Sequence, residues 1–224
     1  GSLLHVNENY RRLIDADPGE VQVSLDGASK AVFERIRRGA WFEKVTANAK
    51  LLNEYCLGRN LLKTRSWTVV QRDNVHELED LVRLGAELKF PRMTFSVALS
   101  NWGLERWTES NRDLDVSAQV SAERVAGLVE LGRGLGVEVT FWNAGQKFQL
   151  GGDPKRLCAW LFERAFISSD LRVVPCCVLS SPEQVDLGEA LDLDRIWNQA
   201  AYRELRAAHL SGQIPDWCRQ CYGM

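Results

Sequence analysis

Runs of apolar residues with two different spacings follow one another along the first 142 residues. Runs rich in β-branched and aromatic residues predict strands at 21–25, 65–71, 92–99 and 137–142. Apolar residues three or four positions apart predict helices at 8–16, 42–55, 74–88 and 121–135. Because strands alternate with helices, we predict an α/β fold in which helices pack on a parallel sheet, as a barrel or a doubly wound sheet.

Local signals refine two of these helices. The helix at 42–55 is expected to bury a stripe made of Val45, Asn48, Ala49, Leu52 and Tyr55. The next helix opens with Asn74, followed three positions later by Glu77. An Asx residue and a Glu at this spacing are typical of a capping arrangement, so we assign Asn74 to helix capping.

The alternation of strands and helices stops near residue 150. The stretch LGGDP (150–154) has turn chemistry, and it predicts a boundary between a domain of residues 1–150 and one of residues 151–224. The second domain contains two strand-like runs, at 160–167 and 172–179. It also contains one amphipathic helix through Leu193, Ile196, Trp197, Ala200, Ala201 and Leu205.

Composition excludes some classes of function. The 224 residues are 45% hydrophobic and 26% charged, which is typical of a globular protein. A net charge of −2 argues against a nucleic-acid binder, because such proteins need a positive excess. The longest apolar runs are too short to span a bilayer, and the first residues do not read as a signal peptide, so we predict a soluble cytoplasmic protein.

Five of the six cysteines lie in the last third of the chain. Cys56 lies on an apolar helix and is expected to be a small buried hydrophobe. Cys218 and Cys221 form a C-x-x-C pair, which further cysteines could complete into four sulfur ligands. Such a set suits a tetrahedral zinc ion or an iron–sulfur cluster, and the spacing alone does not choose between them. Buried or redox thiols with no common role are the remaining alternative.

Two stretches resemble one family. Residues 21–52 (VQVSLDGASKAVFERIRRGAWFEKVTANAKLL) resemble the fourth strand and following helices of radical S-adenosylmethionine (radical SAM) enzymes. Residues 170–221 resemble the C-terminal cluster-binding extension of these enzymes, called SPASM, or its shorter relative, the twitch domain. The markers are Pro175-Cys176-Cys177, Leu187-Gly188, Ile196-Trp197-Asn198, Tyr202 and the closing C-x-x-C.

The resemblance implies a partial (β/α)₆ barrel of the TIM type, which binds S-adenosylmethionine on a catalytic [4Fe-4S] cluster, and a small α+β domain with an auxiliary [4Fe-4S] cluster. Cys158, Cys176, Cys218 and Cys221 match the four ligands of the single auxiliary cluster in twitch proteins. Cys177 is then a spare buried thiol, a substitute ligand or a weak candidate for a hydrogen-atom donor.

The resemblance also points to the end of the first strand, where Ser24 and Asp26 match polar positions that hold the ribose and amino acid parts of S-adenosylmethionine. Arg38 could pair with the carboxylate of that cofactor. The alternative is that Asp26-Gly27 only turns the chain and that Arg37 and Arg38 are solvated.

Some family features are lacking. The C-x₃-C-x₂-C motif of the catalytic cluster does not occur, and the opening GSLL resembles the end of the third strand's turn, so we expect an N-terminally truncated chain that is inactive alone. Cysteines for a second auxiliary cluster are also lacking, which favours the twitch type. Leu171 stands where the family has a glycine, so the turn of its hairpin is in question.

In the intact enzyme, the resemblance implies that S-adenosylmethionine yields a 5′-deoxyadenosyl radical that abstracts a substrate hydrogen, as in dehydrogenases, epimerases and peptide maturases. The implied partners are a small polar molecule or peptide and a one-electron donor such as flavodoxin or ferredoxin. The loop at 100–113, with Trp102 and Trp107, is expected either to contact substrate or to cover the core. The alternative function is a non-enzymatic zinc- or iron–sulfur-binding module for docking or electron transfer.

Overall fold

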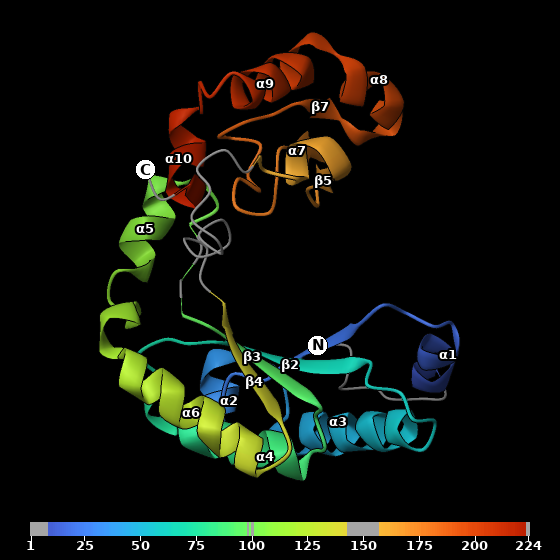
Figure 1. Ribbon diagram of the computed structural model, residues 1–224, viewed down its shortest axis with the longest axis vertical. Coiled ribbons are helices and arrows are strands. Elements are labelled where there is room, and N and C mark those ends of the chain that lie inside the picture. The colour runs from blue at the N-terminus through green and yellow to red at the C-terminus, as the bar shows by residue number, and fades with distance from the viewer. Residues whose placement is uncertain (1–8, 98, 100, 143–156, 223–224) are drawn as a thin grey trace. The chain divides into compact units, whose positions relative to one another are not determined.

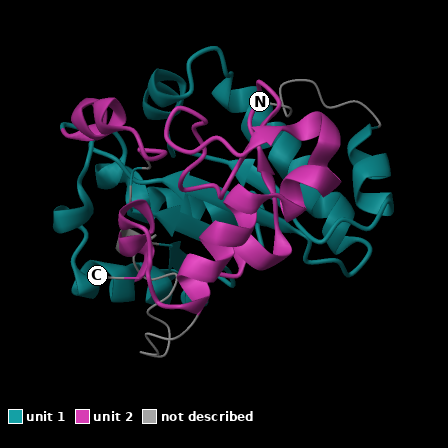
Figure 2. Cartoon of the chain, turned by 90° about the horizontal axis from the view of Figure 1, so that it is seen from above, with its two compact units in different colours: residues 1–99, 113–142 teal, residues 100–112, 143–224 magenta. Residues whose placement is uncertain are grey.

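The chain divides into two units, which Figure 2 shows in different colours. The first unit comprises residues 1–99 and 113–142, and the second comprises residues 100–112 and 143–224. The computed structural model describes residues 9–97, 99, 101–142 and 157–222. The expected boundary at residue 150 lies outside the described residues, so the division at that point stays a prediction.

Four parallel strands form the sheet of the first unit. They are β1 (Val21–Ser24), β2 (Thr64–Val69), β3 (Arg92–Ser96) and β4 (Glu138–Trp142), and they lie side by side in that order. Each strand is parallel to its neighbour. The expected α/β class with a parallel sheet is therefore confirmed.

Helices connect these strands. The connecting elements are α2 (Lys30–Ile36), α3 (Phe42–Leu57), the 3₁₀ turn η2 (Val75–Glu77), α4 (Leu78–Glu87), the 3₁₀ turn η3 (Ser117–Gln119) and α6 (Ala122–Gly134), whereas α1 (Asn9–Asp15) precedes β1. Helices α2, α3, α4 and α6 lie on one side of the sheet (Figure 1). In the described part of the chain, no helix is long and apolar enough to cross a membrane.

The two faces of this sheet differ in character. Toward the helices it presents buried residues such as Val23, Met93 and Phe95, which share a core with α3, α4 and α6. The opposite face carries an in-register row across all four strands, made of Ser24, Trp67, Thr94 and Thr140. In the described part of this unit no helix lies on this face, where Ser24 and Thr140 are exposed and Thr94 is 3% exposed.

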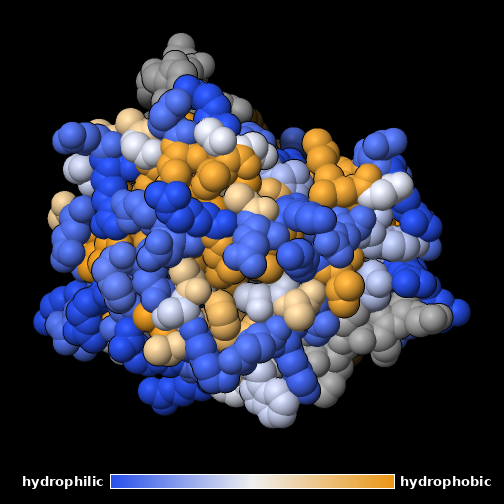
Figure 3. Space-filling model, turned by 90° about the horizontal axis from the view of Figure 1, so that it is seen from below, coloured by the Kyte–Doolittle hydropathy of each residue, from blue (hydrophilic) through white to orange (hydrophobic). Residues whose placement is uncertain are grey.

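Helix α3 shows how the buried stripe differs from the expected one. Val45, Ala49 and Leu52 are buried as expected, but Asn53 and Cys56 complete the stripe instead of Asn48 and Tyr55. Cys56 is 1% exposed, as expected for a small buried hydrophobe. On the surface view of Figure 3, hydrophobic residues form separate groups among hydrophilic ones.

The second unit is built from short elements. They are α5 (Glu105–Asn111), α7 (Trp160–Glu163), β5 (Phe166–Ile167), β6 (Arg172–Val174), β7 (Gly188–Glu189), the 3₁₀ turn η5 (Ala190–Asp192), α8 (Leu193–Asn198), α9 (Ala200–Leu210) and α10 (Asp216–Tyr222). Strands β5, β6 and β7 form an antiparallel sheet. Its core comprises Leu161, Val173, Leu187, Ile196, Tyr202 and Leu205.

Three expectations for this unit need correction. The run at 160–167 is a helical turn followed by a two-residue strand, rather than one strand. Strand β6 ends at Val174 because Pro175 has no backbone N–H to continue the ladder. The single amphipathic helix is two helices, α8 and α9. Between them Gln199 is extended, with ψ 167°, and its side-chain amide donates to the carbonyl of Leu187.

Residues 101–112 belong to the second unit and include α5. Arg106 makes a two-pronged ion pair with Glu183, with both N–O distances 2.6 Å. Trp102 and Trp107 meet edge to face, with ring centroids 5.4 Å apart. Each tryptophan is 40% exposed, so neither is a core residue.

Leu171 lies in the turn between β5 and β6 with φ +61°, which is the left-handed region. A residue without a Cβ adopts this conformation without strain, whereas leucine does not. The turn therefore keeps a geometry suited to glycine although the sequence supplies leucine there.

Candidate functional site

The four cysteines expected to bind metal come from three parts of the second unit. Cys158 lies just before α7, Cys176 follows β6, and Cys218 and Cys221 lie one turn apart on α10. All four side chains are half-buried. Cys176 also accepts a hydrogen bond at its Sγ, from the backbone N–H of Leu179 at 3.5 Å.

Electrostatics links these four thiols. The pKa of Cys218 is raised to about 12, first by burial and then by the negative charge that Cys176, Cys158 and Cys221 carry when ionised. Cys177 does not appear among these causes. Cys158, Cys176 and Cys221 therefore lie near enough to Cys218 for their negative charges to oppose its ionisation. A bound cation would have the opposite effect and would favour the ionised thiolates.

The arrangement differs from that of a site for one ion. Among the described residues, no three His, Cys, Asp or Glu side chains are placed to hold a single metal ion. A tetrahedral zinc needs its sulfurs within about 4 Å of one another, because each Zn–S bond is about 2.3 Å. A four-iron cluster spreads its thiolate ligands over several iron atoms and so accepts wider spacing.

Helix α9 presents three buried polar atoms along one face of the second unit. Tyr202 Oη, Arg206 Nη2 and His209 Nε2 have no hydrogen-bond partner among the described residues. Tyr202 and His209 are 0% and 2% exposed. Because all three groups can donate a hydrogen bond, and buried donors normally have acceptors, an anionic group with several acceptor atoms would fit beside this helix.

Tyr222 connects two of the elements that carry cysteines. Its hydroxyl oxygen accepts a hydrogen bond from the backbone N–H of Cys158 at 3.0 Å. It also lies 2.8 Å from Nδ1 of His209 on α9. Neither Tyr222 nor His209 belongs to a recognisable motif, and the adjacency of Tyr222 to Cys221 is the one sequence signal that points to it.

In the first unit, Asp26 and Arg38 line one hollow at the carboxyl end of β1, together with Ile36, Arg37, Gly39 and Ala40. Ser24 does not line this hollow, and its side chain is exposed on the uncovered face of the sheet. The structure therefore brings two of the three expected residues together.

Asp26 is 2% exposed, and both of its carboxylate oxygens have partners. Oδ1 accepts from the backbone N–H of Val69 at 2.8 Å, and Oδ2 pairs with Arg37. Burial nevertheless raises the pKa of Asp26, and the charge of Arg37 opposes that shift only in part. Arg38 is exposed and has no ion-pair partner in the described part of the chain.

The expected capping role of Asn74 is wrong, because its side chain makes no hydrogen bond to the helix that follows. Asn74 is instead fully buried, and its amide donates to the carbonyls of Asp26 at 3.0 Å and Val69 at 2.9 Å. Glu77 accepts from the N–H groups of Ala28 at 2.8 Å and Ser29 at 3.3 Å. The two side chains fix the loop after β1, which sequence spacing could not reveal.

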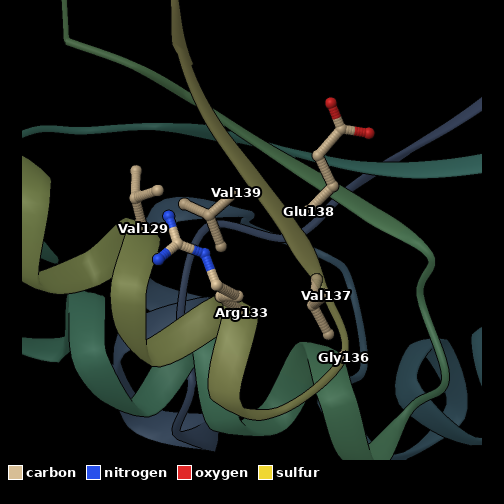
Figure 4. A pocket seen from close by; sticks show the side chains of 6 residues that line it. All are labelled: Val129, Arg133, Gly136, Val137, Glu138 and Val139. Atoms are coloured by element: carbon tan, nitrogen blue, oxygen red, sulfur yellow. The ribbon is translucent and has the colours of Figure 1, made fainter.

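A second hollow lies between α6 and β4 (Figure 4). Arg133 of α6 lines it, but the carboxylate of Glu138 on β4 points away from Arg133 in the view of Figure 4. Glu138 and Val139 open β4, so this hollow lies at the amino end of the strand. Parallel α/β folds place their chemistry at the carboxyl ends of strands, which favours the hollow beside Asp26 as the candidate site.

Comparisons with known proteins agree with these observations. Residues 158–222 match the SPASM family, described as an iron–sulfur cluster-binding domain. The fold is similar to that of SuiB from Streptococcus suis, solved bound to the precursor peptide SuiA, with a TM-score of 0.51 and 15% sequence identity. That likeness covers 83% of this chain but only 44% of SuiB. A search of curated proteins gives no match. The family match agrees with the expected SPASM-type segment, and the likeness to SuiB shows a shared fold.

Proposed function

We propose that the second unit holds one auxiliary [4Fe-4S] cluster through Cys158, Cys176, Cys218 and Cys221, and that the chain belongs to a radical SAM enzyme. The observation that carries the proposal is the match of residues 158–222 to the SPASM iron–sulfur cluster-binding domain, because this segment contains all four cysteines. The effect of the other three thiols on the pKa of Cys218 agrees with it. Four thiolates are the usual ligands of such a cluster. Cys177, next to Cys176, is then not a ligand of the cluster.

The residues around these thiols suit an anionic cluster. The N–H of Leu179 already donates to Cys176 Sγ, and the buried donors of α9 offer further hydrogen bonds. Hydrogen bonds to the sulfurs and burial both influence the reduction potential of an iron–sulfur cluster. We assign the cluster a role in substrate binding or electron transfer, with a one-electron donor such as flavodoxin or ferredoxin as partner.

The first unit would bind S-adenosylmethionine at the carboxyl end of its sheet. Arg38 is exposed at the rim of the hollow and offers a guanidinium to the cofactor's carboxylate. Asp26 is committed to Arg37 and Val69, so its contribution is to hold Arg37 and the backbone of the loop. Ser24 and Trp67 lie on the uncovered face, where they would contact ligand. When bound to its catalytic [4Fe-4S] cluster, S-adenosylmethionine supplies a 5′-deoxyadenosyl radical for hydrogen abstraction.

The proposal includes a partial (β/α)₆ barrel, in which further strands of the complete enzyme would extend the sheet β1–β4. The uncovered polar face would then line the inside of the barrel. Because the likeness to SuiB covers 44% of that protein, the radical chemistry is proposed for the complete enzyme. The structure of SuiB with a precursor peptide supports a peptide as the substrate, which makes peptide maturation our preferred reaction.

The proposed ligand set is tested by six single Cys→Ser variants of the full chain. Each is reconstituted anaerobically with ferrous iron and sulfide, and its bound iron is measured. Substitution of Cys158, Cys176, Cys218 or Cys221 is expected to lower the iron content sharply or leave an unstable cluster. Substitution of Cys56 or Cys177 is expected to leave the iron content unchanged. Equal iron in all six variants would contradict the assignment.

A further inference from the structure

The side chain of Tyr222 occupies a junction in the second unit. It follows Cys221 directly on α10, and its hydroxyl reaches the backbone N–H of Cys158, which lies 64 positions earlier in the chain. On its other side the hydroxyl meets His209 of α9 at 2.8 Å, and the two rings lie 5.7 Å apart between centroids. One phenol oxygen thus connects the helix that carries Cys218 and Cys221 with the backbone of Cys158.

The direction of these hydrogen bonds follows from donors and acceptors. The N–H of Cys158 can only donate, so the Tyr222 oxygen accepts there. The contact of 2.8 Å with Nδ1 of His209 then takes the hydroxyl proton of Tyr222. A neutral histidine is needed for Nδ1 to accept, and burial lowers the pKa of His209, which favours the neutral ring. In this tautomer the proton of His209 lies on the buried Nε2.

We propose that Tyr222 and His209 are positioning residues for the auxiliary cluster, which hold Cys158 in place relative to Cys218 and Cys221. This inference rests on the proposed function, because it assumes that these cysteines share one cluster. Neither residue is a ligand: His209 orients the Tyr222 hydroxyl, and the hydroxyl fixes the backbone of Cys158. Partners of this kind set the geometry of metal ligands and commonly change metal affinity 10- to 100-fold when removed.

The test compares the wild-type chain with Tyr222→Phe, which keeps the ring but removes the hydroxyl. Both proteins are reconstituted with iron and sulfide, and iron release to a chelator is followed under anaerobic conditions. We expect release from Tyr222→Phe to be about tenfold faster or more. We also expect a shifted midpoint potential of the cluster, because the Cys158 backbone is no longer fixed.

Tyr55→Phe is the matched control. Its hydroxyl also makes two contacts, to the carboxylate oxygens of Asp15 at 2.9 and 3.0 Å, but it belongs to the first unit. Thermal unfolding of both variants without iron measures the general cost of losing a phenol hydroxyl. If Tyr222 served stability alone, the two variants would lose iron at the wild-type rate after correction for unfolding.

Two substitutions of His209 complete the test. His209→Leu removes Nδ1, which accepts the hydrogen bond from the Tyr222 hydroxyl. We expect it to speed iron release as Tyr222→Phe does. His209→Asn keeps a polar group near the position of Nδ1 and is expected to restore slow release in part. If Tyr222→Phe keeps its iron and its midpoint potential like the wild type, the positioning role is wrong while the cluster stands. If the wild-type chain takes up no cluster, the proposed function fails first.

Discussion

The buried carboxylate of Asp26 forms an ion pair with the guanidinium of Arg37, on the helix α2 side of the hollow, while the neighbouring Arg38 stays exposed. Asp26 is 2% exposed, whereas the side chain of Arg37 is 38% exposed. The pair therefore engages Arg37, whereas Arg38 has no ion-pair partner in the described part of the chain. It also places a carboxylate where burial resists its ionisation.

The Asp26 pair predicts a pH dependence of stability. Burial raises the pKa of Asp26 above its ordinary value of 3.8, so the folded protein holds this proton more tightly than the unfolded chain does. The contribution of Asp26 to stability is therefore complete below pH 3.8 and is lost as the pH rises through the folded pKa. We therefore compare the free energy of unfolding of the wild type with that of Asp26→Asn. The difference, wild type minus variant, is expected to fall as the pH rises from 3.8 through the folded pKa of Asp26. Urea unfolding of both proteins at several pH values measures this difference. A difference that rises with pH would mean that the effect of Arg37 on the pKa of Asp26 exceeds the effect of burial.

The turn after β1 leaves no room for a side chain at Gly27. A Cβ there would lie 2.5 Å from the backbone N of Phe33 and 2.8 Å from its Cα, so α2 would have to move. We expect Gly27→Ala to lower the free energy of unfolding by about 1–3 kcal/mol. Gly127→Ala on α6 is the control, because a Cβ there meets nothing within 4 Å. The free energy of unfolding of Gly127→Ala should rise by about 0.5–1 kcal/mol, because alanine has a higher helix propensity than glycine. Equal effects of the two changes would refute the close approach.

Replacement of Leu171 by glycine is expected to stabilise the protein. The φ of +61° at Leu171 strains a leucine, and 54% of its surface is exposed, so little burial would be lost on substitution. We expect Leu171→Gly to raise the free energy of unfolding by roughly 0.5–1 kcal/mol, because relief of strain exceeds the added entropy of the unfolded chain. Leu191→Gly, at an 82% exposed position without a positive φ, should lower it instead. Chemical denaturation of both variants checks this, and a destabilised Leu171→Gly would contradict the strained turn.

Periodicity predicted the first unit well because its strands are buried on one face. The runs at 21–25 and 92–99 became β1 and β3, and the helical spacing at 121–135 became α6. The predicted capping role of Asn74 was wrong because residues in an Asx-x-x-Glu pattern can either cap a helix or make tertiary hydrogen bonds. Its amide bonds to Asp26 across the fold, and only the positions of the two strands decide between these roles.

The second unit was less predictable because its elements are short and depend on tertiary contacts. Gln199 breaks a continuous amphipathic pattern by turning its side chain to Leu187. The proposed ligands Cys158 and Cys218 followed from the resemblance to a family, and spacing alone left zinc open. The contact between Tyr222 and Cys158 spans 64 positions, and no local signal marks it.

The central claim is that four cysteines of the second unit share one iron–sulfur cluster, and its most direct test is the iron and sulfide content of the wild-type chain after anaerobic reconstitution. The account predicts a brown protein with about four irons and four sulfides per chain. A colourless protein that instead holds one zinc ion tightly, and takes up no iron or sulfide, would contradict it.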